Sequence, residues 1–463
     1  MSPMRPTIPA VIRAYTLVGV LVAAAMLAAP LAGQAQPVPA AQYCEAPIVR
    51  REVLRNERGN PIYVSPESFI AQDGELLVAG QFSIEFVRND KNVYDVSQPN
   101  SVLAVVRSSD GTVRTFPRFP MGELLPTALR AVAMGNGSWG VLVHAAKIDP
   151  NAPQVVRGTL WFATLTRSGW GAVERVPLPR DVHPLSTMAR HMVVVGDRVI
   201  AAMTADSGDE VNGVLLVERE RGKWRTRFLN TGVASYTALA LDGATGELVL
   251  GVVRADQTQA SDANSLFLMF PDRRNHALRL LVRGGQSPVH HPVMHATSRG
   301  ISVAWRVHER NEQGRSKTAV QAVVEPRRAQ MASRIIAEPA YVTTVSGHEA
   351  LALVAARNTR ADSIYVTLHT LPAPSVGVRL RYSSSFAEVI GAARWSESEI
   401  AVGLLAAKDG NHLVNEILWI GTRCTGAVTS TSATDTASSY RSPHHVQPSH
   451  SSSGRAAVRE RLP

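Results

Sequence analysis

The feature of this sequence that most constrains its fold is a repeated unit of four short apolar strands. Each unit reads as a strand, a tight Gly/Asp/Ser turn, a second strand, a long polar loop, a third strand, a turn and a fourth strand, and the clearest copy spans Thr237 to Val282. The first turns of the units lie at Asp73-Gly74, Asn136-Gly137, Gly196-Asp197, Gly243 to Gly246, Arg299-Gly300, Gly347-His348 and Ser396 to Ser398. Regular four-stranded units are typical of a β-propeller, so we expect an all-β, seven-bladed propeller of antiparallel blades over residues 36–424.

The ends of the repeat region indicate how such a ring would close. The last unit supplies only three strands, and the start of the region offers a fourth from Glu45 to Leu54. A ring closed by strands from both termini leaves no free sheet edge. The only two cysteines, Cys44 and Cys424, flank this junction. An even cysteine count in an exported chain favours a Cys44–Cys424 disulfide, with two unrelated buried thiols as the alternative.

The N-terminal segment, residues 1–35, has the parts of a secretory signal peptide. A basic start over residues 1–14 is followed by an apolar run and by small residues ending at Ala35. We expect cleavage near Ala35, export to the periplasm or the extracellular space, and no stable membrane span after cleavage; an uncleaved anchor is the alternative. Residues 425–463 are rich in Ser and Thr without apolar periodicity, which predicts a disordered tail.

Composition excludes several classes of function. Basic residues outnumber acidic ones 48 to 38, but only five of the 48 are lysines and no basic run exceeds two residues, so we expect no nucleic-acid partner. His290, His291 and His295 form the densest histidine group, yet no Cys or Asp/Glu pattern accompanies them, so we expect no metal and no cofactor. No nucleophile elbow, zincin motif or phosphate-binding glycine loop occurs.

Loop lengths distinguish the two faces of the expected ring. The connections between second and third strands are longer than the others, as in residues 87–100 and 254–264, and binding groups concentrate on long loops held by a rigid scaffold. Prolines recur where one blade leads into the next. The polar residues expected near them, at the mouth of the central channel, are Glu67, His183, Tyr236, His291, Glu338 and Tyr341. Charges in inner strands require an anion, a carboxylate partner or water, and the arginines in that position are Arg130, Arg190 and Arg394.

The blade pattern RGISVAWRV, from Arg299 to Val307, and the turns R-S-G-W at Arg167 and R-G-K-W at Arg221 resemble those of sialidase-like, BNR-type secreted propellers. In such turns Gly and Trp fix a hairpin against the blade; the complete box S-x-D-x-G-x-T-W is absent here. The resemblance is one of fold. It implies that Arg130, Arg190 and Arg394 could serve as a carboxylate-binding triad and that Tyr236 or Tyr341 with Glu67 or Glu338 could serve as a Tyr/Glu pair.

Three hypotheses about function follow. The leading one is an exported, non-catalytic propeller that binds a protein, peptide or glycan through its long-loop face. The alternative is a sialidase-like glycoside hydrolase or lyase that uses the channel arginines and a Tyr/Glu pair. A structural component of an envelope assembly, tethered by the Ser/Thr-rich tail, is the third. Fold alone does not distinguish a catalytic propeller from a binding one.

Overall fold

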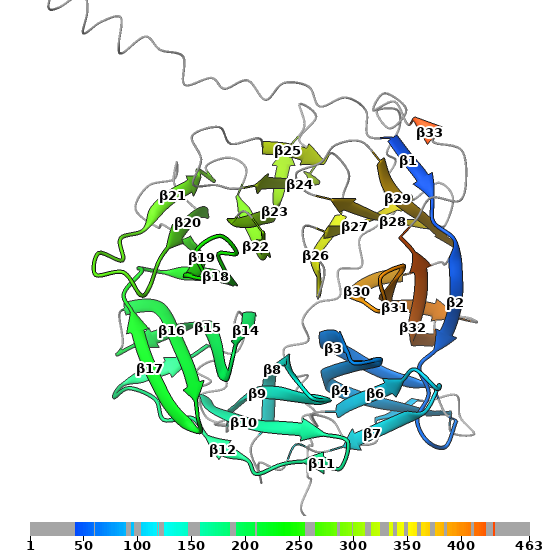
Figure 1. The fold of residues 1–463 in the computed structure, drawn as a ribbon, viewed down its shortest axis with the longest axis horizontal. Helices are drawn as coiled ribbons and strands as arrows, with labels where there is room; N and C mark the ends of the chain where they lie inside the picture. Colours follow the sequence, from blue (N-terminus) through cyan, green and yellow to red (C-terminus); the bar gives the residue numbers. More distant parts are fainter. Residues whose placement is uncertain are drawn as a thin grey trace, which may run out of the picture.

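The computed structural model is an all-β protein whose antiparallel sheets are arranged around a central axis (Figure 1). It describes residues 42–59, 61–88, 94–96, 103–117, 119, 125–146, 158–185, 191–208, 211–254, 264–284, 288–298, 300–310, 316–324, 333–336, 340–346, 351–358, 363–370, 376–383, 387–408, 412–422 and 429–430. Within these residues no helix is long and apolar enough to cross a membrane.

The N-terminal sheets follow one another in chain order. The first comprises β3 (Ile62–Gln72), β4 (Glu75–Arg88), β6 (Leu103–Ser108) and β7 (Val113–Pro117), with β5 (Tyr94–Val96) paired to β4. The second comprises β8 (Leu125–Gly135), β9 (Ser138–Ala146), β10 (Gly158–Thr166) and β11 (Gly169–Trp170), with β12 (Glu174–Arg175) paired to β10. In the third, β13 (Val182–Pro184) and β14 (His191–Val195) both pair with β15 (Arg198–Ser207), followed by β16 (Val211–Glu220) and β17 (Lys223–Leu229).

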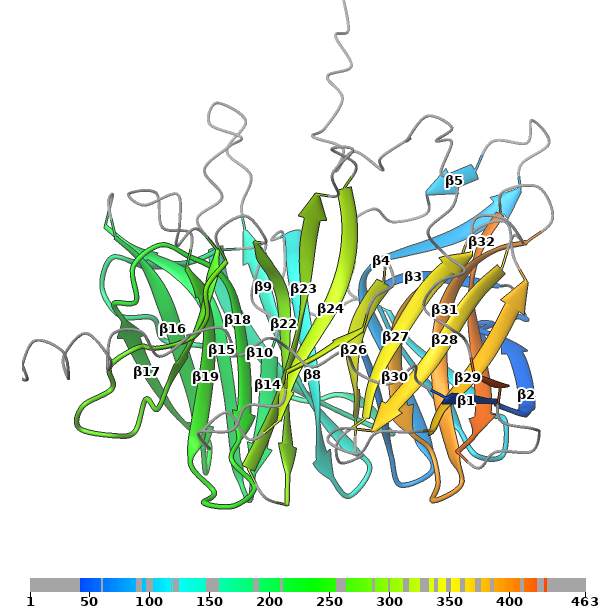
Figure 2. The same cartoon turned by 90° about the horizontal axis from the view of Figure 1, so that it is seen from above.

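Two further sheets repeat the pattern, and Figure 2 shows β18, β19, β22, β23 and β24 of these sheets running along the central axis. One comprises β18 (Ala234–Leu241), β19 (Leu248–Arg254), β20 (Ser265–Met269) and β21 (Arg279–Val282). The other comprises β22 (Val289–Thr297), β23 (Gly300–Arg310), β24 (Ser316–Val324) and β25 (Ser333–Ile336). In each sheet the first strand lies nearest the axis and the last lies at the outer edge, which is the blade geometry of a propeller.

The remaining strands form one continuous ten-stranded sheet. It joins β26 (Ala340–Ser346), β27 (Leu351–Asn358), β28 (Ser363–Thr370) and β29 (Val376–Ser383) to β30 (Ala387–Arg394), β31 (Glu399–Lys408), β32 (His412–Gly421) and β2 (Ile48–Val53). The two groups meet at their inner strands, where β26 and β30 pair in parallel. The outer strand β29 pairs with β1 (Gln42–Glu45), and β1 pairs with β33 (Thr429–Ser430).

The N-terminal strand β2 and the C-terminal strand β32 pair in this region. β2 pairs antiparallel with β32 and so supplies the outer strand that the C-terminal group lacks. The expected strand from Glu45 to Leu54 is nevertheless interrupted at Pro47, because proline has no N–H to donate to a ladder. Cys44 therefore lies in β1, which pairs with β29 in the same ten-stranded sheet, rather than at the start of β2. Cys424, Gly347-His348 and residues 1–35 lie outside the described residues, as does all of the expected tail except residues 429–430.

Ion pairs and an aromatic stack hold β2 in place. Arg107 of β6 is almost fully buried; its Nε donates to Glu52 of β2 over 2.9 Å, and its guanidinium lies 4.7 Å from the ring centroid of Trp419 in β32. Arg51 of β2 pairs with the buried Glu416 of β32. The first sheet, the N-terminal strand and the last sheet are thus linked by one set of contacts.

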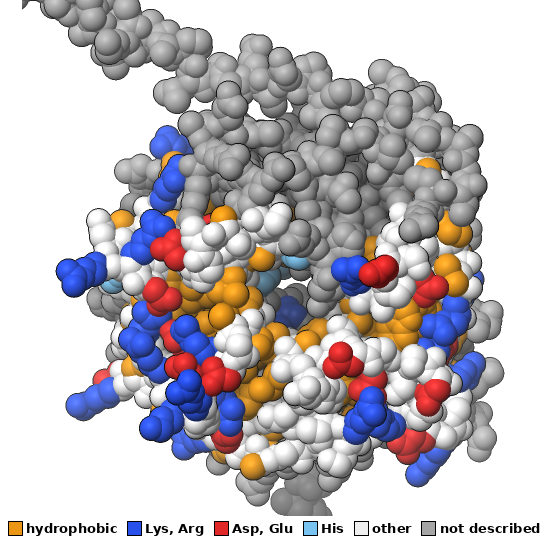
Figure 3. Space-filling view, viewed as in Figure 1, with side chains coloured by type: hydrophobic (Ala, Val, Ile, Leu, Met, Phe, Trp, Pro, Cys, Tyr) orange, Lys and Arg blue, Asp and Glu red, His pale blue; other side chains and the backbone are white. Residues whose placement is uncertain are grey.

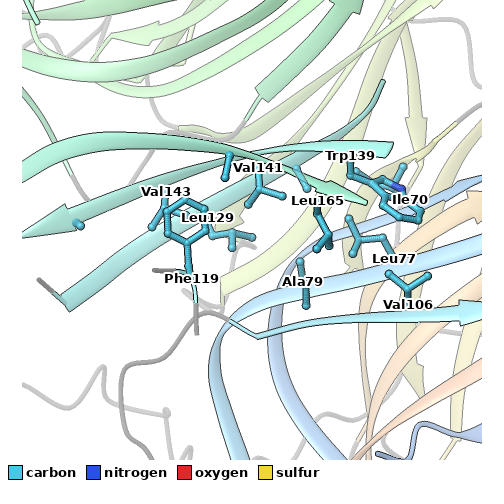
Figure 4. Packing of buried hydrophobic residues seen from close by; sticks show 14 residues of the cluster. Ile70, Leu77, Ala79, Val106, Phe119, Leu129, Trp139, Val141, Val143 and Leu165 are labelled. Carbon is cyan, nitrogen blue, oxygen red and sulfur yellow. The ribbon is translucent and has the colours of Figure 1, made fainter. Parts of the chain in front are cut away.

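Both faces of most sheets are buried, because each sheet is packed between two others. Figure 4 shows one such interface, in which Leu77 and Val106 of the first sheet pack against Leu129, Trp139 and Val141 of the second. On β15 the side chains alternate: Ala201 and Met203 pack toward the β8–β11 sheet, whereas Ile200 and Ala202 pack toward the β18–β21 sheet. This period of two determines which way every later residue of the strand faces.

The first turns of the first two units have the conformation that their sequences require. Asp73 and Gly74 have φ of 50° and 71°, and Asn136 and Gly137 have φ of 52° and 64°. Two successive residues with positive φ are characteristic of the type I′ turn, which is the turn that fits the twist of a two-residue hairpin. The Asp-Gly and Asn-Gly pairs therefore act as the hairpin signals that the sequence indicates.

Candidate functional site

The inner strands are irregular where they begin, at the end of the ring that carries the long loops. The ladders shift register between Val64 and Pro66, between Pro126 and Ala128, between Ala234 and Tyr236, between His290 and Val293, and between Val389 and Gly391. An extra residue in one strand re-aims the neighbouring side chains, and bulges of this kind are frequent beside binding and active sites. The recurring prolines lie in or beside these bulges, where no ladder N–H is required.

Three successive junctions between sheets carry polar groups at this end. At the first, His144 of β9 is buried. It lies two residues after Leu142 and therefore on the same face of the strand, which packs against the β13–β17 sheet. Its Nε2 lies 3.0 Å from the carbonyl oxygen of Pro184, so the imidazole donates a hydrogen bond across the junction. Burial lowers the pKa of His144 from 6.5 to about 4, and the hydrogen bond to Pro184 opposes this effect. The neutral imidazole therefore connects β9 to β13 through a hydrogen bond to Pro184, the residue after His183.

At the second junction, apolar rows of β15 and β19 that belong to one buried cluster end in polar residues. On β15 the row of Ile200 and Ala202 continues, by alternation, to Thr204 and Asp206. On β19 the row of Leu248, Leu250 and Val252, which packs against those residues, continues to Arg254. Asp206 is the cross-strand partner of His183 in β13. We refer to Thr204, Asp206, Arg254 and His183 as the β15–β19 polar cluster.

Several atoms of the β15–β19 polar cluster are buried without a hydrogen-bond partner in the described part of the chain: Thr204 Oγ1, Asp206 Oδ1 and Arg254 Nε. The Arg254 guanidinium lies 5.4 Å from the ring centroid of Phe267, and no ion pair with a described carboxylate accompanies this contact. Burial raises the pKa of the Asp206 carboxyl, and the nearby His183 partly opposes that shift. Perturbed pKa values and unsatisfied polar atoms are both more frequent at functional sites than elsewhere.

At the third junction, Tyr236 of β18 lies against two histidines of β22. The ring centroids of Tyr236 and His291 are 4.6 Å apart, and those of Tyr236 and His290 are 5.9 Å apart at an interplanar angle of 84°. His291 has a φ of 46°, a left-handed conformation that is uncommon among residues other than glycine. His290 is paired across the ladder with Arg306. Figure 3 shows histidine surface at the edge of the central opening.

The structure places three predicted residues at this end of the inner strands: His183, Tyr236 and His291. The two described arginines of the expected triad, Arg130 and Arg394, lie at different positions along their strands. Arg130 lies in the middle of β8, opposite Leu142, whereas Arg394 is the last residue of β30, is exposed, and donates from Nε to the carbonyl oxygen of Ser396 in the following turn. Arg190 and Glu338 lie outside the described residues, and Glu67 and Tyr341 are placed only by their backbone, in β3 and β26.

Sequence reasoning did not identify His144 or Thr204, and it placed Asp206 and Arg254 in long loops rather than in β15 and β19. Each is a polar residue that ends or interrupts an apolar strand, as in VLVHAA and AAMTADS. That signal is visible in the sequence, but its meaning depends on which sheets face one another. Among the described residues no group of His, Cys, Asp and Glu side chains is arranged to hold a metal ion.

Neither a protein-family model nor a curated protein sequence matches the chain. Solved structures do. The polysaccharide lyase Uly1 is 10% identical, with a TM-score of 0.47, over 83% of this chain and 97% of its own. A protein of unknown function from Dyadobacter fermentans gives the same identity and TM-score over 82% and 99%. A subtype N11 neuraminidase-like protein of A/flat-faced bat/Peru/033/2010 is 8% identical, with a TM-score of 0.31, over 62% and 96%. Subtype N10 and N11 neuraminidase-like proteins are thus among the solved structures that this chain is similar to, with TM-scores of 0.36 and 0.31.

Proposed function

We propose that this protein is an exported, seven-bladed β-propeller that binds a protein, peptide or glycan partner through its long-loop face and does not catalyse a reaction. In this proposal residues 1–35 are removed on export, and the ring is closed by β2 and by a Cys44–Cys424 disulfide. The proposal concerns location, ring closure and activity together, and each part has its own support.

The observation that carries the binding role is the run of polar clusters at three successive sheet junctions. His144, the β15–β19 polar cluster and the Tyr236–His291 contact all lie where the inner strands begin and the long loops leave the sheets. The rest of these junctions combines apolar clusters with ion pairs such as Arg219–Glu174 and Arg227–Asp272. Polar groups that replace core residues at one end of a rigid scaffold are suited to recognition, because their positions are fixed by the packing beneath them.

Two observations support the proposed closure. β2 completes the group formed by β30, β31 and β32. Cys44 is fully buried, and the described residues contain no free cysteine. Cys424 is the other cysteine of the sequence. A disulfide also fits the oxidising compartment that the N-terminal segment implies. Non-reducing peptide mapping of the exported protein would contain the cross-linked pair, and N-terminal sequencing would begin just after Ala35; separate thiols or an intact N-terminus would contradict this part of the proposal.

The binding role is tested by thermal-shift measurements on the exported protein with peptide pools, neutral and acidic oligosaccharides, and sialosides. A ligand that binds only the native state raises the melting temperature in proportion to its occupancy. The variant His291→Asn changes the long-loop end while retaining a residue that tolerates positive φ, and we expect it to reduce the shift. Its matched control is Arg221→Gln, which removes an exposed ion pair with Asp197 at the opposite end.

The results separate the hypotheses. A shift that His291→Asn reduces and Arg221→Gln leaves intact supports binding at the long-loop face. A shift in melting temperature that Arg221→Gln reduces and His291→Asn leaves intact contradicts it. The absence of a shift with any ligand also contradicts it. Recovery of a cleaved or unsaturated saccharide after incubation would replace the binding role with the hydrolase or lyase alternative.

A further inference from the structure

The two Asn-Gly pairs of this chain lie in opposite structural surroundings. Asn136-Gly137 forms the exposed hairpin turn between β8 and β9, whereas Asn212-Gly213 lies within β16. Asparagine is chemically labile before glycine, because glycine has no side chain to shield its backbone nitrogen. We propose that Asn136 is a site of spontaneous deamidation in the folded protein, that Asn212 is protected, and that the product weakens the contact between the first two sheets. This inference does not depend on the proposed binding function.

The reaction consumes only water. The backbone nitrogen of Gly137 loses its proton to solvent and attacks the side-chain carbonyl carbon Cγ of Asn136. The new N–C bond closes a cyclic imide, the bond from Cγ to Nδ2 breaks, and Nδ2 takes up a proton and leaves as ammonia. Water then opens the imide at either carbonyl, which gives aspartate or isoaspartate. Nothing is oxidised or reduced.

The hairpin turn leaves both reacting groups close to solvent. Asn136 is exposed, and Asn136 and Gly137 have φ of 52° and 64°. The N–H of Gly137 donates to Oδ2 of Asp73, an exposed side chain, over 3.2 Å. This bond and the turn conformation must give way before the Gly137 nitrogen can reach the side chain of Asn136. Exposed turns open locally at a low free energy, so the reaction is accessible from the native state.

Asn212-Gly213 consists of the same residues but lies inside a sheet. Gly213 is opposite Ala205 in the antiparallel ladder with β15. It is buried, and an added Cβ would lie 2.4 Å from the carbonyl oxygen of Leu229 and 2.6 Å from the ring of Phe228. Rotation of this peptide unit therefore requires β16 to separate from its neighbours, which costs far more free energy than opening a turn. The fold protects Asn212.

The reaction at Asn136 takes place where side chains join the first sheet to the second. Oε1 of Gln72 in β3 accepts a hydrogen bond from the N–H of Gly135 over 3.0 Å, and its Nε2 donates to the carbonyl oxygen of Ser138 over 2.8 Å. These two contacts lie on either side of Asn136. Isoaspartate inserts a methylene group into the backbone between them, so both cannot keep their present geometry. The modified turn is therefore held less tightly to β3.

The test follows both asparagines in one sample. The full-length exported protein is incubated at neutral and mildly alkaline pH, once native and once in urea, and peptide mapping by mass spectrometry measures the amide that remains at each position. In the native protein Asn136 should react at least about tenfold faster than Asn212, because their local opening free energies differ. In urea the two rates should converge, since both asparagines precede glycine. Electron-transfer fragmentation distinguishes aspartate from isoaspartate.

Two variants connect the modification to its effect on stability. Asn136→Gly keeps a residue that tolerates positive φ but has no side-chain amide. Incubated wild type should develop a species that melts about 1–4 °C lower, the size expected for one or two lost hydrogen bonds, and incubated Asn136→Gly should not. Asn136→Asp adds the charge of one product without the extra backbone atom and should melt close to fresh wild type, because exposed charges contribute little.

Three outcomes overturn this inference, and none of them affects the proposed binding role. In the native protein Asn212 could react as fast as Asn136, which refutes protection by the fold. The amide of Asn136 could persist in the native protein while it is lost in urea, which refutes the modification site. Complete conversion of Asn136 without a change in melting temperature refutes the weakened contact between the first two sheets.

Discussion

Acidification should destabilise this protein through one buried imidazole. His144 is 3% exposed, and its Nε2–H donates to the carbonyl oxygen of Pro184. In the native state its pKa is lowered from 6.5 to about 4 by burial. The unfolded chain, in which the imidazole is hydrated, retains the ordinary value. The two states therefore bind a different number of protons between these pH values.

The sign and size of the effect follow from this difference. Above the unfolded pKa the residue is neutral in both states and its contribution to stability is fully present. As the pH falls below 6.5 the unfolded chain takes up a proton that the native protein excludes until about pH 4. The free energy of unfolding then falls by about 1.4 kcal/mol per pH unit, or about 2 kcal/mol from pH 7 to pH 5.

The measurement compares urea unfolding of the wild type and of His144→Gln at pH 7, 6 and 5. The glutamine amide can still donate to Pro184 but does not titrate. Contributions from all other groups, including Asp206 with its raised pKa, are common to both proteins and cancel in the difference. We expect the stability of the wild type relative to the variant to fall by about 2 kcal/mol between pH 7 and pH 5. If the free energies of unfolding of the wild type and of His144→Gln change equally between pH 7 and pH 5, the assignment of a neutral, buried His144 is refuted.

Three further predictions concern packing and ion pairs, and each is checked by urea or thermal unfolding. Gly158→Ala should cost about 1–3 kcal/mol, because the added Cβ would lie 1.8 Å from His144 Nε2; an equal cost in a His144→Ala background would contradict this reason. Arg107→Met should cost about 3–5 kcal/mol by leaving Glu52 without its partner, and a cost below about 1 kcal/mol would show that the pair does not hold β2. Glu218→Gln should cost about as much, since this buried carboxylate pairs with two arginines; Glu220→Gln, exposed on the same strand, is its control.

Much of the fold could be predicted because its signals are local. Asp73-Gly74 and Asn136-Gly137 specify hairpin turns by themselves, and the apolar strands between them are readable from a few residues. The position of Cys44 could not be predicted in this way. β1 pairs in parallel with β29, more than 300 positions away, and nothing near Cys44 in the sequence marks that partner.

In the candidate site, too, the residues with a local sequence signal could be predicted and those that depend on sheet packing could not. His183 and His291 could be identified because they stand beside prolines that recur at the start of the inner strands. Asp206 and Arg254 were assigned to long loops, because the sequence does not show how far β15 and β19 extend or which sheets pack together. A single sequence shows the alternation within each strand, but it does not show which rows meet.

The pairing of β2 with β32 also determines the order in which the protein can be completed. Arg51 and its partner Glu416 are 365 positions apart. At a synthesis rate of about 5–20 residues per second, β2 is made roughly 20–70 s before the strand it pairs with. During that interval it is an unpaired edge that carries Ile48 and Val49, which remain 45% and 55% exposed even in the finished sheet. A chain that stops before His412 therefore leaves β2 without its partner β32, as well as its last sheet incomplete.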